Sequence, residues 1–235
     1  MDAHRRVAVI TGASSGIGLA SARLLAGQGW GVVLAARGQV ALEQTTADLG
    51  SYAHLVVADV GEAAGCEAIV SAAVERFGRV DALVNNAGFA PLASIEATSD
   101  DLLSRVYAVN ALGPARLIAR VWPIMAAQRS GCIVNVSTIG AVREPFPGFF
   151  AYASAKASLG VMARSCALEG RRLGIRAFAV APGAVETPML RANFDAKAIA
   201  PSRCLAASEV AEVIVACIRG DRDSENGRTI EMPSP

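Results

Sequence analysis

Short apolar runs rich in β-branched residues alternate with longer amphipathic stretches along the whole chain. Apolar runs of about four to eight residues are typical of buried strands, and apolar positions that recur every three or four residues are typical of helices. The pattern predicts strands over residues 6–10, 31–36, 54–58, 82–85, 131–136, 175–181 and 229–232. It predicts helices between them, over residues 16–28, 40–49, 62–77, 99–129, 152–172 and 208–219.

Strands that alternate with helices from end to end are typical of an α/β fold, in which helices cover both faces of a parallel sheet. Such strands are buried on both sides, which agrees with their nearly continuous apolar runs. We find no internal repeat, low-complexity tract or linker. We therefore expect one doubly wound, Rossmann-like domain over residues 1–235, with ligands bound at the carboxyl ends of the strands.

Composition and charge exclude several classes of function. Basic and acidic residues number 22 and 21, and no basic cluster suits a nucleic-acid partner. No charge-free apolar stretch is long enough to span a membrane, and the apolar run ending at Ile10 is too short for a signal peptide, so we expect a cytoplasmic protein. The five cysteines form no CxxC pair and there are only two histidines, so we expect no metal site.

A glycine-rich turn, residues 11–18, follows the first predicted strand and opens the first predicted helix. Glycines let the backbone turn tightly and approach a ligand, and a helix N-terminus offers free N–H groups to phosphate. A glycine pattern in this strand–turn–helix context predicts a dinucleotide site. The residues concerned are Gly12, Ser14, Ser15, Gly16, Ile17 and Gly18.

Two further motifs occur in order along the chain. Asn85-Asn86-Ala87-Gly88 ends the fourth predicted strand. Tyr152 and Lys156 are four residues apart on a predicted helix and thus share one helix face. A nearby ammonium group favours the phenolate, so we expect Lys156 to lower the pKa of Tyr152 toward the range useful for acid–base chemistry.

Together the Gly-x-x-x-Gly-x-Gly turn, the Asn-Asn-Ala-Gly motif and Tyr-x-x-x-Lys resemble the short-chain dehydrogenase/reductase family. The resemblance extends from Val7 to about Met232. It implies a parallel sheet of about seven strands in the order 3-2-1-4-5-6-7. It also implies an enzyme that moves a hydride between nicotinamide and a carbonyl or alcohol carbon, with Tyr152 as the proton-transfer group and Lys156 beside it.

The resemblance also implies a catalytic asparagine and a catalytic hydroxyl. Asn110, within the long predicted helix 99–129, would kink that helix and hold a water that links Lys156 to solvent. Thr138 matches the usual position of the hydroxyl, at the end of the fifth strand, and Ser137 is the alternative. The spacing from Thr138 to Tyr152 is one residue longer than is usual in the family, so the choice between these two hydroxyls stays open.

Cofactor preference depends on the end of the second strand. Ala36 stands where NAD-dependent members of the family carry an aspartate, and Arg37 follows it. An arginine can hold a phosphate through paired hydrogen bonds, so we expect NADP(H). NAD(H) is the alternative, in which Arg37 stacks on adenine, and the absence of a basic residue at Ser15 favours that alternative.

Further cofactor contacts follow from the resemblance alone. Asp59 would accept a hydrogen bond from adenine, while Pro182-Gly183 would lie along the nicotinamide and Val185 and Thr187 at its carboxamide. The complete set of cofactor-binding residues that the resemblance implies is Gly12, Ser14, Ser15, Gly16, Ile17, Gly18, Arg37, Asp59, Val60, Asn86, Ala87, Gly88, Asn110, Tyr152, Lys156, Pro182, Gly183, Val185 and Thr187.

The substrate pocket is expected to comprise Phe89, the loop 143–150 and the segment 186–200, which includes Met189, Leu190 and Phe194. Apolar side chains dominate, which favours a hydrophobic ketone or alcohol. Arg143 and Arg191 could bind an anionic group of the substrate or could be surface charges.

The resemblance implies a homo-oligomer, a dimer or a tetramer, formed through the helices 99–129 and 152–172. Two rival functions remain: an NAD-dependent alcohol or sterol dehydrogenase of the same family, and a non-catalytic NADP-binding regulator. The second predicts a broken catalytic set, whereas all four predicted groups are present.

Overall fold

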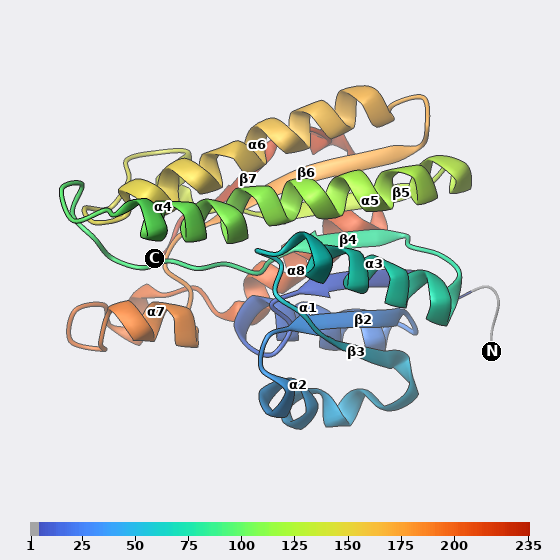
Figure 1. Ribbon diagram of the computed structural model, residues 1–235, viewed down its shortest axis with the longest axis horizontal. Helices are drawn as coiled ribbons and strands as arrows, with labels where there is room; N and C mark the ends of the chain where they lie inside the picture. Colours follow the sequence, from blue (N-terminus) through green and yellow to red (C-terminus); the bar gives the residue numbers. More distant parts are fainter. Residues whose placement is uncertain (1–4) are drawn as a thin grey trace.

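The computed structural model describes residues 5–235 and contains one seven-stranded sheet (Figure 1). Every strand pairs in parallel with its neighbours, in the order β3-β2-β1-β4-β5-β6-β7, so the predicted fold class and strand order are confirmed. Residues 1–4 of the predicted domain lie outside the described residues. The strands are β1 Val7–Thr11, β2 Gly31–Ala36, β3 Ala53–Val57, β4 Ala82–Asn85, β5 Gly131–Val136, β6 Ile175–Pro182 and β7 Thr229–Met232.

Helices cover both faces of the sheet. One layer consists of α1, α2 and α8, and the other contains α3, α5 and α6. Figure 1 shows α4 and α5 end to end along one face, with α6 beside them. The α-helices are α1 Gly16–Gly27, α2 Gln39–Thr46, α3 Ala63–Phe77, α4 Asp100–Tyr107, α5 Gly113–Gln128, α6 Phe150–Gly170, α7 Pro188–Asn193 and α8 Ala207–Arg219.

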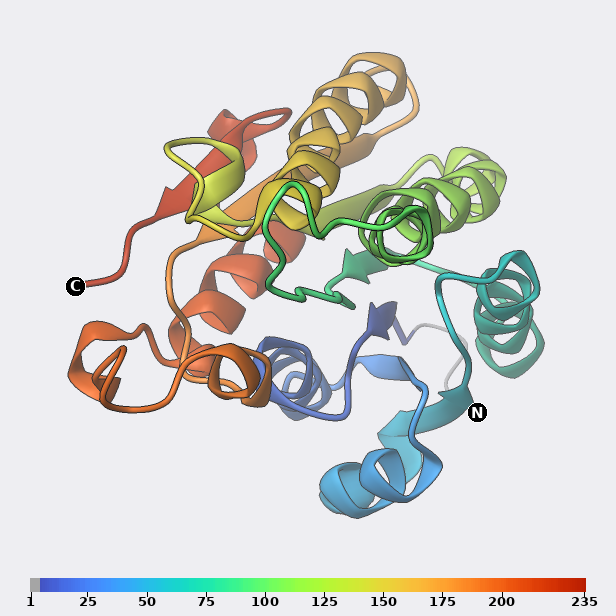
Figure 2. The same ribbon diagram turned by 60° about the vertical axis from the view of Figure 1, so that its left-hand side comes forward.

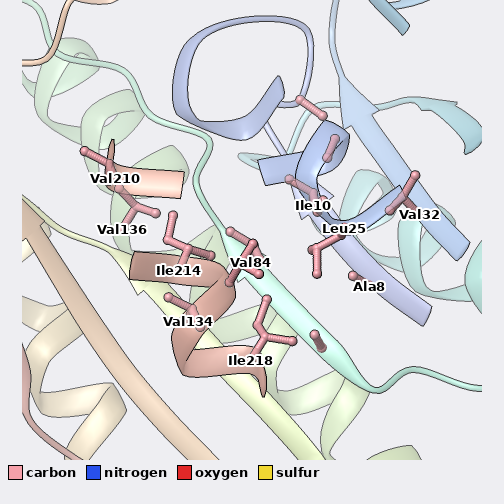
Figure 3. Close-up of a cluster of buried hydrophobic side chains, with 14 of the residues drawn as sticks. Ala8, Ile10, Leu25, Val32, Val84, Val134, Val136, Val210, Ile214 and Ile218 are labelled. Carbon is pink, nitrogen blue, oxygen red and sulfur yellow. The ribbon is translucent and has the colours of Figure 1, made fainter. Parts of the chain in front are cut away.

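Alternate residues of each strand face opposite helix layers. In β1, Ala8 and Ile10 belong to the core beneath α1 and α8, whereas Val7 and Val9 belong to the core beneath α3 and α5. Both faces are therefore buried, which explains the continuous apolar runs of the strands. Figure 3 shows part of the first core, with side chains of α8 over those of the central strands: Val84, Val134, Val136, Val210, Ile214 and Ile218.

The long predicted helix 99–129 is divided in the structure. A π-helical turn, Ala108–Leu112, separates α4 from α5. A π-turn accommodates one residue more than an α-helical turn, and such turns are frequent at functional sites. The expected distortion at Asn110 therefore takes the form of a widened turn.

Helix α7 was not predicted as a helix. It has six residues, with Thr187 as its N-cap and Pro188 at its first position. In Figure 1 and Figure 2 it stands out beyond the ends of the strands, at the edge where the carboxyl ends lie. Within residues 5–235, no helix is both long enough and apolar enough to cross a membrane.

Candidate active site

A cavity of about 710 Å³ lies at the carboxyl ends of the strands. It is bounded by the glycine-rich turn, by the ends of β2, β4, β5 and β6, by the start of α6, and by the segment that carries α7. All of the predicted catalytic and cofactor-binding residues line this cavity except Gly18 and Asn110. Topology thus gathers groups that are far apart in the sequence at one edge of the sheet.

The glycine-rich turn depends on residues without side chains. Gly12 and Gly16 have φ angles of +65° and +54°, in the left-handed region that favours glycine. A Cβ added to Gly18 would lie 2.5 Å from the carbonyl oxygen of Gly12, so Gly18 is needed for the turn to fold onto its helix. Gly18 therefore supports the turn from within and does not face the cavity.

The Asn-Asn-Ala-Gly motif ties adjacent strand ends together. The Asn86 amide donates to the carbonyl oxygens of Thr11 at 2.8 Å and Gly12 at 3.2 Å. The Thr11 hydroxyl accepts from the backbone N–H groups of Asn86 and Ala87. A further bond, 2.9 Å long, runs from Asn85 on β4 to the side chain of Asn135 on β5. These bonds fix the floor of the cavity.

The end of the cavity beside β2 fits a dinucleotide. Ser15 precedes α1 without accepting a side-chain hydrogen bond from it, and the first turn contains no acidic residue, which leaves N–H groups available to phosphate. Arg37 is exposed at the rim and has neither an ion pair nor a hydrogen bond within residues 5–235. Asp59 lines the same end, and its carboxylate accepts from Gly61 N at 2.8 Å. The free N–H groups of α1 and the Arg37 guanidinium are donors that suit an anionic nucleotide.

Tyr152 and Lys156 both face the cavity from the first turns of α6. Lys156 is only 2% exposed, and its ammonium donates to the carbonyl oxygen of Val136 at 2.7 Å. Its Nζ lies 6.0 Å from the centre of the Tyr152 ring. Burial lowers the pKa of Lys156 to about 8.

The predicted lowering of the Tyr152 pKa was wrong for this structure. Burial raises the pKa of Tyr152 to about 12, because a phenolate loses more hydration than a phenol when it leaves water. The Lys156 ammonium is directed to Val136 O, and its charge does not outweigh the effect of burial. Tyr152 is therefore a protonated phenol at neutral pH.

Asn110 lies in the π-helical turn and is completely buried. Its side chain accepts from Phe89 N at 3.1 Å and donates to Phe89 O at 2.7 Å and to Val106 O at 2.9 Å. A Cβ added to Gly88 would lie 3.3 Å from Asn110 Oδ1 and 3.7 Å from Lys156 Nζ. Asn110 thus sits immediately behind Gly88, close to Lys156 and outside the cavity lining.

The two candidate hydroxyls have different environments. Ser137 is 5% exposed, and its hydroxyl donates to Lys156 O at 3.0 Å. Thr138 is partly exposed in the cavity wall, and within the part of the chain that the structure describes its hydroxyl has no hydrogen-bond partner. Thr138 therefore has the hydroxyl that is free to meet a ligand.

One prediction about the substrate end needs correction, and for two arginines the structure favours one of the alternatives that the sequence left open. Phe89 does not line the cavity; it packs among buried helix residues, with Arg105 over its ring at 5.4 Å. Arg143 pairs with Glu231 at 2.6 Å, and Arg191 pairs with Glu186. Both arginines lie outside the cavity lining, so they are surface ion pairs and not anion sites.

Asn193 is a residue whose structural role the sequence did not indicate. Its side-chain amide donates to Ala90 O at 2.8 Å, across 103 positions of sequence, and ties the α7 segment to the loop after β4. No local motif signals such a contact. Among residues 5–235, no cluster of three or more His, Cys, Asp or Glu side chains could hold a metal ion.

Residues 6–198 match the model of the short chain dehydrogenase family. A cis-4-hydroxycyclohexanecarboxylate dehydrogenase from Sinomonas cyclohexanicum is 40% identical over 189 residues, which cover 79% of this chain and 75% of the relative. Levodione reductase from Leifsonia aquatica is 38% identical over 194 residues, which cover 79% and 71%.

Solved structures agree with the sequence relatives. The crystal structure of a levodione reductase superimposes with a TM-score of 0.90 at 32% identity, over 97% of this chain and 96% of the other. A 3-ketoacyl-(acyl-carrier-protein) reductase from Brucella melitensis, complexed with NADH, gives a TM-score of 0.90 at 29% identity, over 96% of both chains. With its sheet order, its glycine-rich turn and these matches, the chain belongs to the short-chain dehydrogenase/reductase family of oxidoreductases, which act on alcohol and carbonyl groups.

Proposed function

We propose that this protein is an NADP(H)-dependent oxidoreductase that interconverts a ketone or aldehyde with its alcohol, with Tyr152 as the general acid and base. One observation carries the proposal. Tyr152, Lys156 and the free hydroxyl of Thr138 line the same cavity as the glycine-rich turn. A proton donor and a hydrogen-bond donor for a carbonyl oxygen thus line the same cavity as the turn proposed to bind the nucleotide.

The nicotinamide, when bound, supplies or accepts the hydride. For reduction, the chain must hold the carbonyl oxygen and deliver one proton to it. Thr138 donates a hydrogen bond to that oxygen, and Tyr152 transfers the proton from its phenol. Since burial holds the pKa of Tyr152 near 12, the phenol keeps its proton at neutral pH and is ready to act as the acid.

Lys156 keeps the site cationic below a pH of about 8. Its ammonium already donates to Val136 O, which fixes the side chain beside Tyr152 before any ligand arrives. A fixed positive charge stabilises the phenolate that forms when the proton leaves Tyr152. Asn110, held by Phe89 and Val106, positions the backbone behind Gly88 next to Lys156.

Arg37 and Ala36 support NADP(H) over NAD(H). Ala36 lines the cavity and offers no carboxylate to a ribose hydroxyl, and Arg37 beside it has no partner among the described residues. An unpaired guanidinium can bind a 2′-phosphate through two parallel hydrogen bonds. The NADH complex of the ketoacyl reductase favours the alternative, that NAD(H) is also used.

The proposed homo-oligomer is supported by exposed apolar side chains on α6. Val161 is 53% exposed and Leu168 is 78% exposed. Contact between copies through the α5 and α6 layer would cover them. Light scattering on the purified protein measures the oligomeric state, and a monomer at all concentrations would contradict this assignment.

The enzymatic proposal is tested by the change in NADPH absorbance with a panel of ketones and aldehydes, next to the Tyr152→Phe variant. Wild-type protein should consume NADPH with at least one class of carbonyl compound. Tyr152→Phe should bind NADPH normally and turn over about 10²–10⁴-fold more slowly. Equal turnover in the variant would remove Tyr152 from the mechanism. NADPH binding with no turnover on any carbonyl or alcohol would favour the non-catalytic regulator.

A further inference from the structure

Three phenylalanine rings form a continuous aromatic wall that begins at Tyr152. The Phe149 ring centre lies 5.3 Å from that of Tyr152, and Phe149 is 6.0 Å from Phe146 and 6.1 Å from Phe194. Phe146 and Phe194 meet edge to face at 5.2 Å. Phe146 and Phe149 come from the loop before α6, and Phe194 directly follows α7. All three line the cavity.

The side chains around the aromatic wall are almost entirely apolar. The same end of the cavity is lined by Ile139, Pro145, Met189, Leu190 and Ile199. Polar side chains here include Asn193, whose amide already donates to Ala90 O, and Glu144 at the mouth. A substrate bound here therefore meets apolar surface on most sides once its reacting oxygen lies against Tyr152.

One exposed carboxylate lies at this end of the cavity. Glu144 lines the cavity mouth and has no ion-pair partner within residues 5–235. The two nearby cations, Arg143 and Arg191, are each neutralised by a carboxylate of this chain, Glu231 and Glu186. Lys156 is the cation in the lining at this end, and it is buried next to the reacting group.

We propose that the substrate is an uncharged ketone or secondary alcohol carried on a ring, which packs against the aromatic wall, and that substrates with a carboxylate are disfavoured. This inference rests on the proposed carbonyl–alcohol activity. A flat or alicyclic ring covers more of the aromatic surface than an open chain of equal carbon number and loses fewer rotations on binding. A carboxylate placed here would lose water and meet only the buried Lys156 ammonium, which already donates to Val136 O, and it would face Glu144.

Three probes of matched size test the proposal in the NADPH assay: 4-oxocyclohexanecarboxylate, its methyl ester and an acyclic keto ester with the same number of carbon atoms. The cyclic ester should have the highest kcat/KM. We expect the cyclic acid to fall below it by about 10–100-fold, the range in which an unpaired polar group affects specificity. A kcat/KM for the acid equal to that of the cyclic ester, or a preference for the acyclic ester, would overturn the substrate class.

Two variants attribute the preference to named residues. Glu144→Lys should raise the ratio of kcat/KM for the acid to kcat/KM for the cyclic ester several-fold. Phe194→Leu, which keeps an apolar side chain without the ring, should lower kcat/KM for the cyclic ester more than for the acyclic ester. Leu190→Val, also in the lining, is the matched control and should affect both esters alike.

The outcomes separate the two proposals. If the acyclic ester is turned over and the three probes have equal kcat/KM values, the proposed carbonyl activity stands. The inference that the substrate is uncharged and carries a ring is then overturned. Absence of turnover with every carbonyl in the larger panel would overturn the proposed function, and the substrate class with it.

Discussion

The hydroxyl of Ser137 donates a hydrogen bond to the backbone carbonyl of Lys156 at 3.0 Å. This bond joins the end of β5 to the second turn of α6, the helix that carries Tyr152. The Ser137 hydroxyl therefore has a structural hydrogen bond. The hydroxyl of the adjacent Thr138 has no partner among the described residues and lies in the cavity wall. The ambiguity between the two hydroxyls that the sequence leaves open thus becomes a difference that can be measured.

Thr138→Ala should lower kcat by about 10²–10³-fold, the usual effect of removing one donor to a developing oxyanion. Its melting temperature should stay close to that of the wild type, because the Thr138 hydroxyl has no partner in the described chain. Ser137→Ala should instead cost about 1 kcal/mol of unfolding free energy, with a smaller loss of kcat. Steady-state kinetics and thermal unfolding of both variants decide between the hydroxyls. The reverse pattern would make Ser137 the catalytic group.

Alcohol oxidation should depend more strongly on pH than carbonyl reduction does. Oxidation requires the Tyr152 phenolate as base, and burial holds the pKa of Tyr152 at about 12. Between pH 6 and pH 8, the phenolate fraction and hence kcat/KM for oxidation should rise about tenfold per pH unit. Reduction needs the phenol and should stay nearly level in the same interval. A kcat/KM for oxidation that does not change between pH 6 and pH 8 would contradict a Tyr152 pKa of about 12.

Arg37→Ala should weaken the binding of NADPH by about 10–100-fold, the expected effect of losing charge-assisted hydrogen bonds to a phosphate. Its Kd for NADH should remain nearly unchanged. Ala36→Asp, at the adjacent cavity-lining position, should favour NADH further by repelling the 2′-phosphate. Fluorescence titration of both variants measures the two constants. Equal losses for both cofactors in Arg37→Ala would indicate that Arg37 binds a part common to them.

Lys156 should make the stability of the protein depend on pH above pH 8. Burial lowers its pKa from 10.5 to about 8, so folded molecules lose this proton at a lower pH than unfolded chains do. Between these values the unfolded chain binds more protons, and the free energy of unfolding therefore rises with pH, by about 3 kcal/mol in all.

The measurement compares urea unfolding of the wild type and of Lys156→Met at pH 8, 9 and 10. The wild type should gain stability relative to the variant across this series. The pKa of Tyr152 is raised to about 12, which opposes this trend only above pH 10 and does so in both proteins. A constant difference between the two proteins would contradict the lowered pKa of Lys156.

Asn110→Ala should lower the free energy of unfolding by about 2–4 kcal/mol, because it removes three side-chain hydrogen bonds, with Phe89 N, Phe89 O and Val106 O. Asn193→Ala is the matched control. It removes one bond to Ala90 O at the periphery and should cost no more than about 1 kcal/mol. Urea unfolding compares the two. Equal costs would mean that the π-helical turn is held by its backbone alone.

Much of the fold was predictable because each strand has a buried, periodic pattern. The bounds of β2, β4, β5 and β7 agree with the predicted ranges. Helix α7 was missed because six residues are too few for a helical period, although Thr187 followed by Pro188 is a typical helix start. The π-helical turn was not predicted as such, since it depends on what Asn110 contacts in the folded chain.

The candidate site was predictable where it consists of local motifs and unpredictable where it depends on side-chain direction. The glycine-rich turn and the Tyr152–Lys156 pair have fixed spacing, so their meeting in one cavity follows from the strand order. Phe89 follows a strand end yet turns toward Arg105. The partners of Arg143 and Arg191 and the approach of Phe194 to Phe146 depend on tertiary packing, which no periodicity encodes.

The widened turn at residues 108–112 makes the length of this stretch of chain matter independently of its side chains. Each residue of a regular helix advances the direction of its side chain by about 100°. Deleting one residue from the turn would restore regular α-helical winding. The side-chain amide of Asn110 would then point away from Phe89, even if every remaining side chain were kept. Insertions and deletions here should therefore be tolerated less than most substitutions.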